Sequence, residues 1–116
     1  MSLQRFHVGQ RLSETAIFNK VIYLAGQIPE DATQDIVGQT TEVLGHVDRL
    51  LAEAGSDKSR ILMCQIFLSD IKLIGGMNQA WDAWVAAGNA PPRATVQAAL
   101  ADPAWLIEVV VTAAQS

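Results

Sequence analysis

Residues 91–112, PPRATVQAALADPAWLIEVVVT, are the stretch on which both the fold and the chemistry of this chain depend. The stretch is predicted to form two β-strands joined by a short turn at residues 101–104, with Arg93 opening the first strand and Glu108 inside the second. Each strand is apolar enough for a core, yet each carries one charged side chain. A buried charge costs on the order of several kcal/mol unless it finds a partner or a ligand, so both charges need an explanation.

The spacing of the two charges within such a hairpin argues against a close ion pair. The period of two along a strand places Arg93, Thr95 and Gln97 on one face, with Glu108 opposite Gln97. Arg93 and Glu108 then share a face but lie roughly 13 Å apart along the ladder, where they would line one groove. A turn one residue longer or shorter would move Glu108 to the other face.

Each charged residue has a functional and a structural interpretation. The Arg93 guanidinium suits bidentate recognition of a carboxylate, but an edge-strand arginine can also form a structural ion pair or be solvated. A carboxylate among apolar neighbours, like that of Glu108, can act as a general base or hold a water molecule, and it can also serve in a salt bridge.

Composition restricts the class of protein. The 116 residues fit one domain, 1–116, with 50% hydrophobic and 17% charged residues. A net charge of −4 with only eight Lys and Arg disfavours a nucleic-acid partner. The single cysteine, Cys64, favours a reducing compartment, and we expect a cytoplasmic protein without a signal peptide or membrane span. His7, His46 and Cys64 have unrelated spacings, so no metal site is expected.

The rest of the chain predicts an α+β domain. Strands are expected at 3–9, 16–18, 21–25 and 60–68, the second and third forming a hairpin at Asn19-Lys20 and the last covered on both faces. Helices are expected at 33–54, capped by Thr33 and stopped by Gly55, and within 71–88, most firmly at 77–87 after Gly75-Gly76. Two helices cover only one face of a mainly antiparallel sheet, so we expect other subunits to bury the second face.

Several segments together resemble the reactive-intermediate deaminase (Rid, or YjgF-like) family. They are Gly26-Gln27-Ile28-Pro29 after a strand, Met77-Asn78 in the second helix, Pro92-Arg93-Ala94-Thr95-Val96, and Ile107-Glu108. The resemblance covers essentially the whole chain. It implies a chorismate-mutase-like domain that forms homotrimers with ligand sites between subunits. It also implies hydrolysis of enamine or 2-imino acids, such as 2-aminoacrylate, to 2-keto acids and ammonia without a cofactor.

The resemblance assigns roles to individual residues. Arg93 would bind the substrate carboxylate, the backbone at Thr95 would contact the imine nitrogen, and Glu108 would hold the attacking water. Gly26 and its neighbour Ala25 would line the cleft.

The chain also departs from the family pattern. Residues 11–14 read Arg-Leu-Ser-Glu where many members have a Gly-Pro-Tyr segment, Ala25 replaces a common serine, and the one tyrosine, Tyr23, lies elsewhere. A trimer that binds small carboxylates without catalysis is therefore an alternative. RNA cleavage is disfavoured by the acidic charge.

Overall fold

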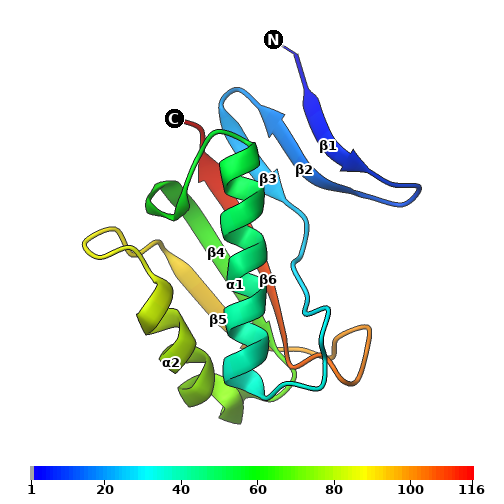
Figure 1. Cartoon of the computed structure of the whole chain (residues 1–116), viewed down its shortest axis with the longest axis vertical. Coiled ribbons are helices and arrows are strands. Elements are labelled where there is room, and N and C mark those ends of the chain that lie inside the picture. Colours follow the sequence, from blue (N-terminus) through cyan, green and yellow to red (C-terminus); the bar gives the residue numbers. More distant parts are fainter. Residues whose placement is uncertain (1) are drawn as a thin grey trace.

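The protein is a six-stranded β-sheet with two α-helices packed against one face, in a computed structural model that describes residues 2–116 (Figure 1). In chain order the elements are β1 (Gln4–Val8), β2 (Ser13–Phe18), β3 (Val21–Leu24), α1 (Ile36–Glu53), β4 (Ile61–Leu68), α2 (Ile74–Trp84), β5 (Arg93–Gln97) and β6 (Ile107–Ala114), with short 3₁₀ helices at Lys58–Arg60 and Ile71–Leu73. The strand order is β1-β2-β3-β6-β4-β5, and among these strands only the β4–β5 pair is parallel. The predicted α+β class with a mainly antiparallel sheet is confirmed.

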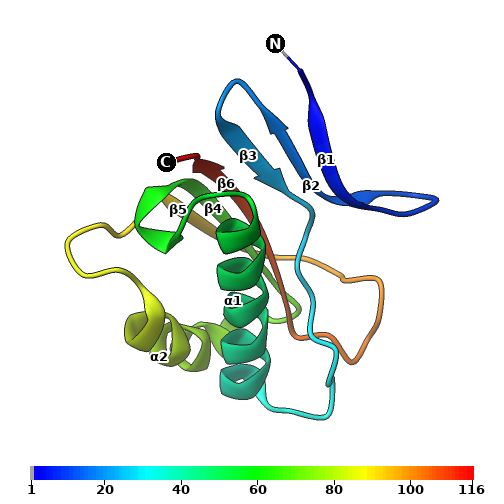
Figure 2. The same cartoon turned by 45° about the horizontal axis from the view of Figure 1, so that its top comes forward.

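The amino-terminal part of the sheet follows the prediction closely. β1 is an edge strand that pairs with β2, and β2 pairs with β3 through a tight turn at Asn19 and Lys20. These two residues have positive φ angles of 59° and 63°, the backbone that a two-residue hairpin turn requires. The first two strands extend from the body of the molecule as a twisted arm (Figure 2).

The predicted hairpin between the last two strands is wrong. β6 pairs with β3 on one side and with β4 on the other, so β4 lies between β5 and β6. β5 runs parallel to β4, with Arg93 opposite Cys64 and Gln97 opposite Leu68. The apolar pattern of a strand indicates that it is buried but not which strand it pairs with, so the insertion of β4 could not be seen in the sequence.

Residues 98–106 therefore cross from the sheet edge to its centre, and α1 anchors this crossover. Gln39, which is fully buried, donates from Nε2 to the carbonyl of Ala104 and accepts at Oε1 from the backbone N–H of Leu106, at 3.1 and 2.8 Å. These bonds satisfy two backbone groups of the crossover, the carbonyl of Ala104 and the N–H of Leu106.

The helix starts differ from the predictions. α1 is capped by Asp35 rather than Thr33, because the Asp35 carboxylate accepts from the N–H of Gly38 at 2.9 Å. α2 begins at Ile74, so the two adjacent glycines lie inside the helix instead of before it. A methyl group on Gly76 would lie 2.5 Å from the Ile36 side chain of α1. The glycine thus allows the two helices to approach closely.

The core lies between α1 and the sheet. Apolar residues of α1 recur at three- and four-residue spacing and are buried, as predicted: Val43, Leu44, Val47, Leu50 and Leu51. They meet alternate residues of the central strands, among them Ile22, Ile66, Val109 and Val111. Each such side chain contributes about 1.5–3 kcal/mol when fully buried. No helix within residues 2–116 is long and apolar enough to cross a membrane.

The second face of the sheet is uncovered and partly apolar. Phe18, Tyr23, Met63 and Val96, from four different strands, are 40–52% exposed on this face. The prediction that β4 is covered on both faces is therefore wrong for a single chain. The sheet has one buried face and one face that lacks a partner layer within the described chain.

Candidate functional site

Glu108 lies at the centre of the sheet and extends over Gly26. It alternates along β6 with the buried Ile107 and Val109, which places it on the uncovered face, opposite Phe67. The chain after β3 is joined to β6 by two backbone bonds between Gln27 and Val109, at 2.7 and 3.0 Å. A methyl group on Gly26 would overlap the Glu108 carboxylate. Glycine is thus the residue that lets the carboxylate occupy this place.

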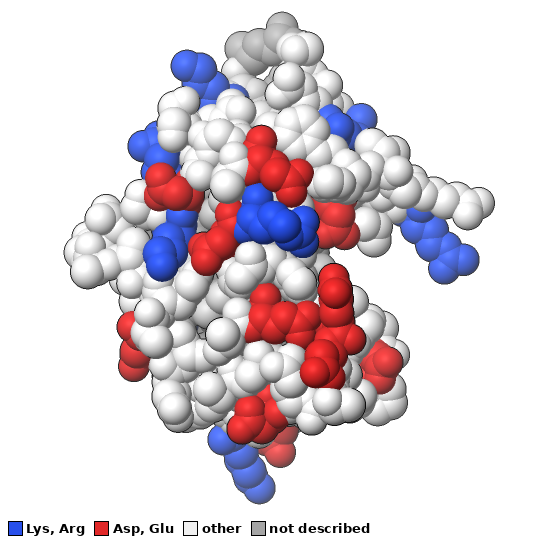
Figure 3. All heavy atoms as spheres, in the orientation of Figure 1, with Lys and Arg blue, Asp and Glu red and all other residues white. Residues whose placement is uncertain are grey.

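Glu108 and Gly26 line a cleft of about 540 Å³ where the β1–β2 arm diverges from the body of the molecule. Its remaining lining comes from the arm, from the segment after β3 and from α1: His7, Leu12, Glu14, Ala25, Gln27, Ile28, Glu30, His46 and Arg49. Figure 3 shows the molecule hollowed on this side, with acidic side chains gathered along the hollow and few basic ones. The cleft therefore suits a small polar ligand better than a polyanion.

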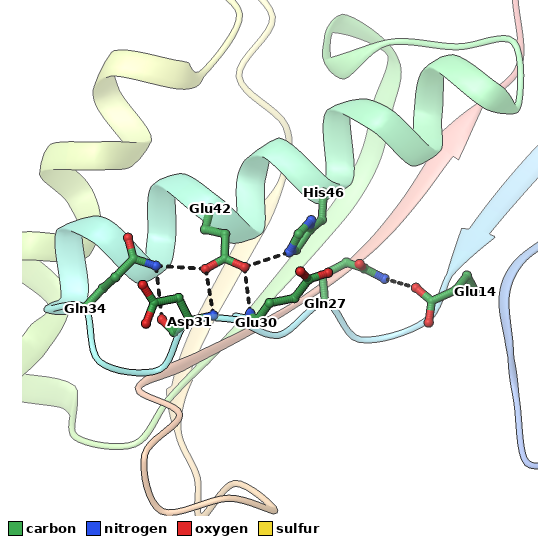
Figure 4. A network of polar contacts seen from close by, with 7 residues as sticks. All are labelled: Glu14, Gln27, Glu30, Asp31, Gln34, Glu42 and His46. Atoms are coloured by element: carbon green, nitrogen blue, oxygen red, sulfur yellow. Dashed lines mark hydrogen bonds and ion pairs between the residues drawn. The ribbon is translucent and has the colours of Figure 1, made fainter.

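A network of hydrogen bonds fixes the segment that carries Gly26 against α1 (Figure 4). The Glu42 carboxylate accepts from the backbone N–H groups of Glu30 and Asp31, at 2.6 and 3.2 Å, and from Gln34 Nε2 at 2.8 Å. It also contacts His46 Nε2 at 3.0 Å. Desolvation is the largest single effect on the pKa of Glu42 and raises it, but these hydrogen bonds outweigh it and leave the pKa below its ordinary value.

Gln27 is a site residue that sequence reasoning did not single out. Its side chain is only 4% exposed, and Nε2 donates to Glu14 Oε2 at 3.0 Å and to the Ala25 carbonyl at 2.9 Å. Glu14 belongs to the segment that departs from the family pattern. The pair joins β2 to the segment after β3 and defines one wall of the cleft beside Gly26.

Arg93 opens β5, the edge strand farthest from the β1–β2 arm, and it is exposed. It points toward α2, where Nη1 donates to Asn78 Oδ1 at 2.9 Å and the guanidinium carbon lies 5.0 Å from the ring centroid of Trp81. No carboxylate of residues 2–116 lies within ion-pair distance of it. The structural ion pair considered for Arg93 is thus absent from the described chain, and its positive charge is not neutralised.

The prediction that Arg93 and Glu108 share a face is wrong. Arg93 pairs with Cys64 on the helix-covered face, whereas Glu108 pairs with Phe67, three residues further along β4, on the uncovered face. Arg93 and Glu108 are two strands apart across the sheet and three residues apart along it, which together separate their Cα atoms by roughly 14 Å. Thr95 lies on the face of Arg93, and its Oγ1 is buried without a hydrogen-bond partner in the described chain. The expected site residues therefore form two separate groups.

Cys64 and the two histidines each have a local environment that the structure defines. Cys64 is fully buried, and burial raises the pKa of its thiol to about 12, an effect that the nearby Arg93 only partly offsets. His46 pairs with Glu42, and His7 pairs with Glu53 of α1 at 2.6 Å. Within residues 2–116 no three His, Cys, Asp or Glu side chains are grouped so as to hold a metal ion.

Comparison with known proteins places the chain in a family. The family model described as Endoribonuclease L-PSP matches residues 3–115. The chain belongs to the L-PSP (YjgF/Rid) family. The family predicted from the sequence is thereby confirmed.

The similarity extends over whole chains. A RutC family protein of Haemophilus influenzae is 52% identical over 114 residues, which cover 97% of this chain and 98% of that protein. A crystal structure of a YjgF family member from Neisseria meningitidis is 43% identical, with a TM-score of 0.97 over 100% of this chain and 97% of the other. A more distant relative is the rat 2-iminobutanoate/2-iminopropanoate deaminase, 26% identical over 89% of this chain and 79% of the rat protein.

Proposed function

We propose that the protein hydrolyses small 2-imino acids and their enamine tautomers to 2-keto acids and ammonia without a cofactor. The observation that carries the proposal is the un-neutralised guanidinium of Arg93, together with a Glu108 carboxylate for which Gly26 leaves room. An exposed arginine without an acidic partner is suited to the carboxylate of a small ligand. The named activity of the distant rat relative adds support.

The proposed reaction uses one residue for binding and one for proton transfer. Arg93 holds the substrate carboxylate, and Glu108 takes a proton from a water molecule as its oxygen adds to C2 of the imine. The imine nitrogen takes a proton from solvent in the same step, which gives a tetrahedral carbinolamine. Glu108 then returns its proton to nitrogen, the C–N bond breaks with its electron pair on nitrogen, and ammonia leaves as the C2 hydroxyl releases its proton to solvent and becomes the carbonyl. The balance is one imine and one water for one keto acid and one ammonia.

Because Arg93 and Glu108 point from opposite faces of one sheet, we propose that each site takes Arg93 from one subunit and Glu108 from another. The uncovered apolar face, with Phe18, Met63 and Val96, provides a surface for assembly. Homotrimers, as the family resemblance implies, would provide three such sites. Light scattering should give three times the 12.5 kDa chain mass, and a monomer in solution would contradict the shared site.

A second candidate is a trimer that binds small carboxylates without turnover. The observation that favours it is the cleft wall beside Gly26, which has Leu12 and Glu14 where many family members place a tyrosine. Tyr23 does not replace it, because its side chain does not line the cleft. RNA cleavage has no comparable support, since the net charge is −4 and the hollow is lined with acidic side chains (Figure 3).

One experiment separates the two candidates. 2-Aminoacrylate is generated in solution, and its conversion to pyruvate is followed with native protein, Arg93→Ala and Glu108→Gln. Turnover above the spontaneous rate that both substitutions reduce by about 100-fold or more supports hydrolysis. No acceleration by native protein, with pyruvate binding that is lost only in Arg93→Ala, supports the binding function instead.

A further inference from the structure

We infer that Trp81 and Asn78 are positioning residues that hold the Arg93 guanidinium ready for a carboxylate while leaving its charge un-neutralised. The inference rests on the proposed function of Arg93 and deepens it. Both residues project from one side of α2, three positions apart, and both contact the guanidinium. Neither carries a charge, so neither neutralises the guanidinium.

Trp81 provides a fixed surface for the guanidinium. Its ring is 6% exposed, and Arg93 stacks over it at 5.0 Å. The ring packs in turn on Trp84, at 5.3 Å between centroids and a tilt of 55°. Trp84 is anchored because its Nε1 donates to both carboxylate oxygens of Asp48 at 3.0 Å. The conformational entropy that an exposed arginine would lose on binding is therefore largely lost already in the free protein.

Asn78 orients the guanidinium without neutralising it. Its Oδ1 accepts one of the five N–H donors of Arg93 and leaves the others for a ligand. An aspartate at this position could accept the same bond more strongly, but it would form an ion pair that a substrate carboxylate must displace. A neutral acceptor and an aromatic face thus fix the direction of the side chain and keep its affinity for anions.

The geometric part of the inference can be tested without a ligand, by NMR of the Arg93 side chain in the intact protein. The ring current of Trp81 should shift the Arg93 Hδ and Hε resonances upfield, and Trp81→Leu should abolish that shift. Trp105→Leu is the control, because it removes an indole outside α2 for which residues 2–116 show no stacking contact with Arg93 or Trp81. Native Arg93 resonances at random-coil positions would overturn the inference.

The functional part is tested by the dissociation constant for pyruvate, the product of 2-aminoacrylate hydrolysis, measured by calorimetry with each variant. Asn78→Asp should weaken binding by at least tenfold although the hydrogen bond and the fold are retained, and Trp81→Leu should weaken it by about three- to tenfold. Trp81→Phe should recover most of the affinity, and Trp105→Leu should bind within twofold of native protein. In turnover, KM should rise while kcat changes little.

The outcomes distinguish this inference from the proposed function. If Arg93→Ala abolishes binding but Asn78→Asp and Trp81→Leu bind within twofold of native protein, the positioning role is overturned and the role of Arg93 stands. If native protein does not bind pyruvate, or if Arg93→Ala binds it unchanged, the proposed function is overturned and this inference with it.

Discussion

The two charged residues of the candidate site are held in contrasting ways. Arg93 lies at the sheet edge and is positioned by the side chains of Asn78 and Trp81 on α2. Glu108 lies in the central strand and is positioned by the backbone, over a glycine that leaves room for it. Single substitutions of Asn78 or Trp81 should therefore change the position of the Arg93 side chain. The position of the Glu108 side chain should respond mainly to substitutions at Gly26.

The largest effect is expected for Gly26→Ala, which directly tests the backbone control of Glu108. The added methyl group would overlap the carboxylate, and a misplacement of about 1 Å at a catalytic group can cost on the order of 100-fold in rate. Turnover of 2-aminoacrylate should fall by about that factor. The affinity for pyruvate should change little, because in the proposed site Arg93, which binds the carboxylate, comes from another subunit and its contacts with α2 do not involve Gly26.

Gly45→Ala is the matched control for this substitution, since a methyl group there meets no atom within 4 Å. It should leave turnover unchanged. If Gly26→Ala were as active as Gly45→Ala, the dependence of Glu108 on the glycine beneath it would be disproved.

A smaller effect, on the free energy of unfolding, is expected for Gly76→Ala. Gly76 lets α2, the helix that carries Asn78 and Trp81, pack closely against α1. A methyl group there meets Ile36 at 2.5 Å, whereas a methyl group on Gly75 meets nothing within 4 Å. Alanine favours a helix by about 1 kcal/mol over glycine, so Gly75→Ala should stabilise the protein. Gly76→Ala should be less stable than Gly75→Ala by about 1–3 kcal/mol because of overpacking. Urea unfolding of both variants measures the difference, and equal stabilities would show that α2 does not depend on this close contact.

The smallest effect concerns Glu42, which anchors the segment carrying Gly26. Its pKa lies below the ordinary value of 4.5, so its ionised form contributes stability that is present above pH 4.5 and lost as the pH falls through the folded-state pKa. Glu42→Gln should cost about 0.5–1 kcal/mol at pH 7. The difference from native protein should shrink below pH 4.5. A difference that stays constant with pH, measured by urea unfolding, would contradict the role of the charge.

The sequence predicted those parts of the fold that depend on local pattern. The stripe of Val43, Val47 and Leu50 on α1, the turn at Asn19-Lys20 and the two helices on one sheet face follow from spacing and turn chemistry. The candidates Arg93 and Glu108 were also visible, because an isolated charge in an apolar strand is conspicuous in a sequence.

The arrangement of the site could not be predicted in the same way. Which face Glu108 occupies relative to Arg93 depends on β4, which enters the sheet between their strands. Strand pairing over such distances leaves no local signal in the residues concerned. The roles of Asn78 and Gln27 also depend on tertiary placement, since an amide on a helix or after a strand has many possible partners.

The position of β6 also has a consequence for how the chain assembles. β6 is the last strand in the sequence, yet it alone connects β3 with β4 in the sheet. Until residues 107–114 have left the ribosome, the preceding strands can form only two separate partial sheets with unpaired inner edges. The emergence of β6 is therefore the step that closes the sheet. Until then the nascent chain carries two unpaired inner strand edges.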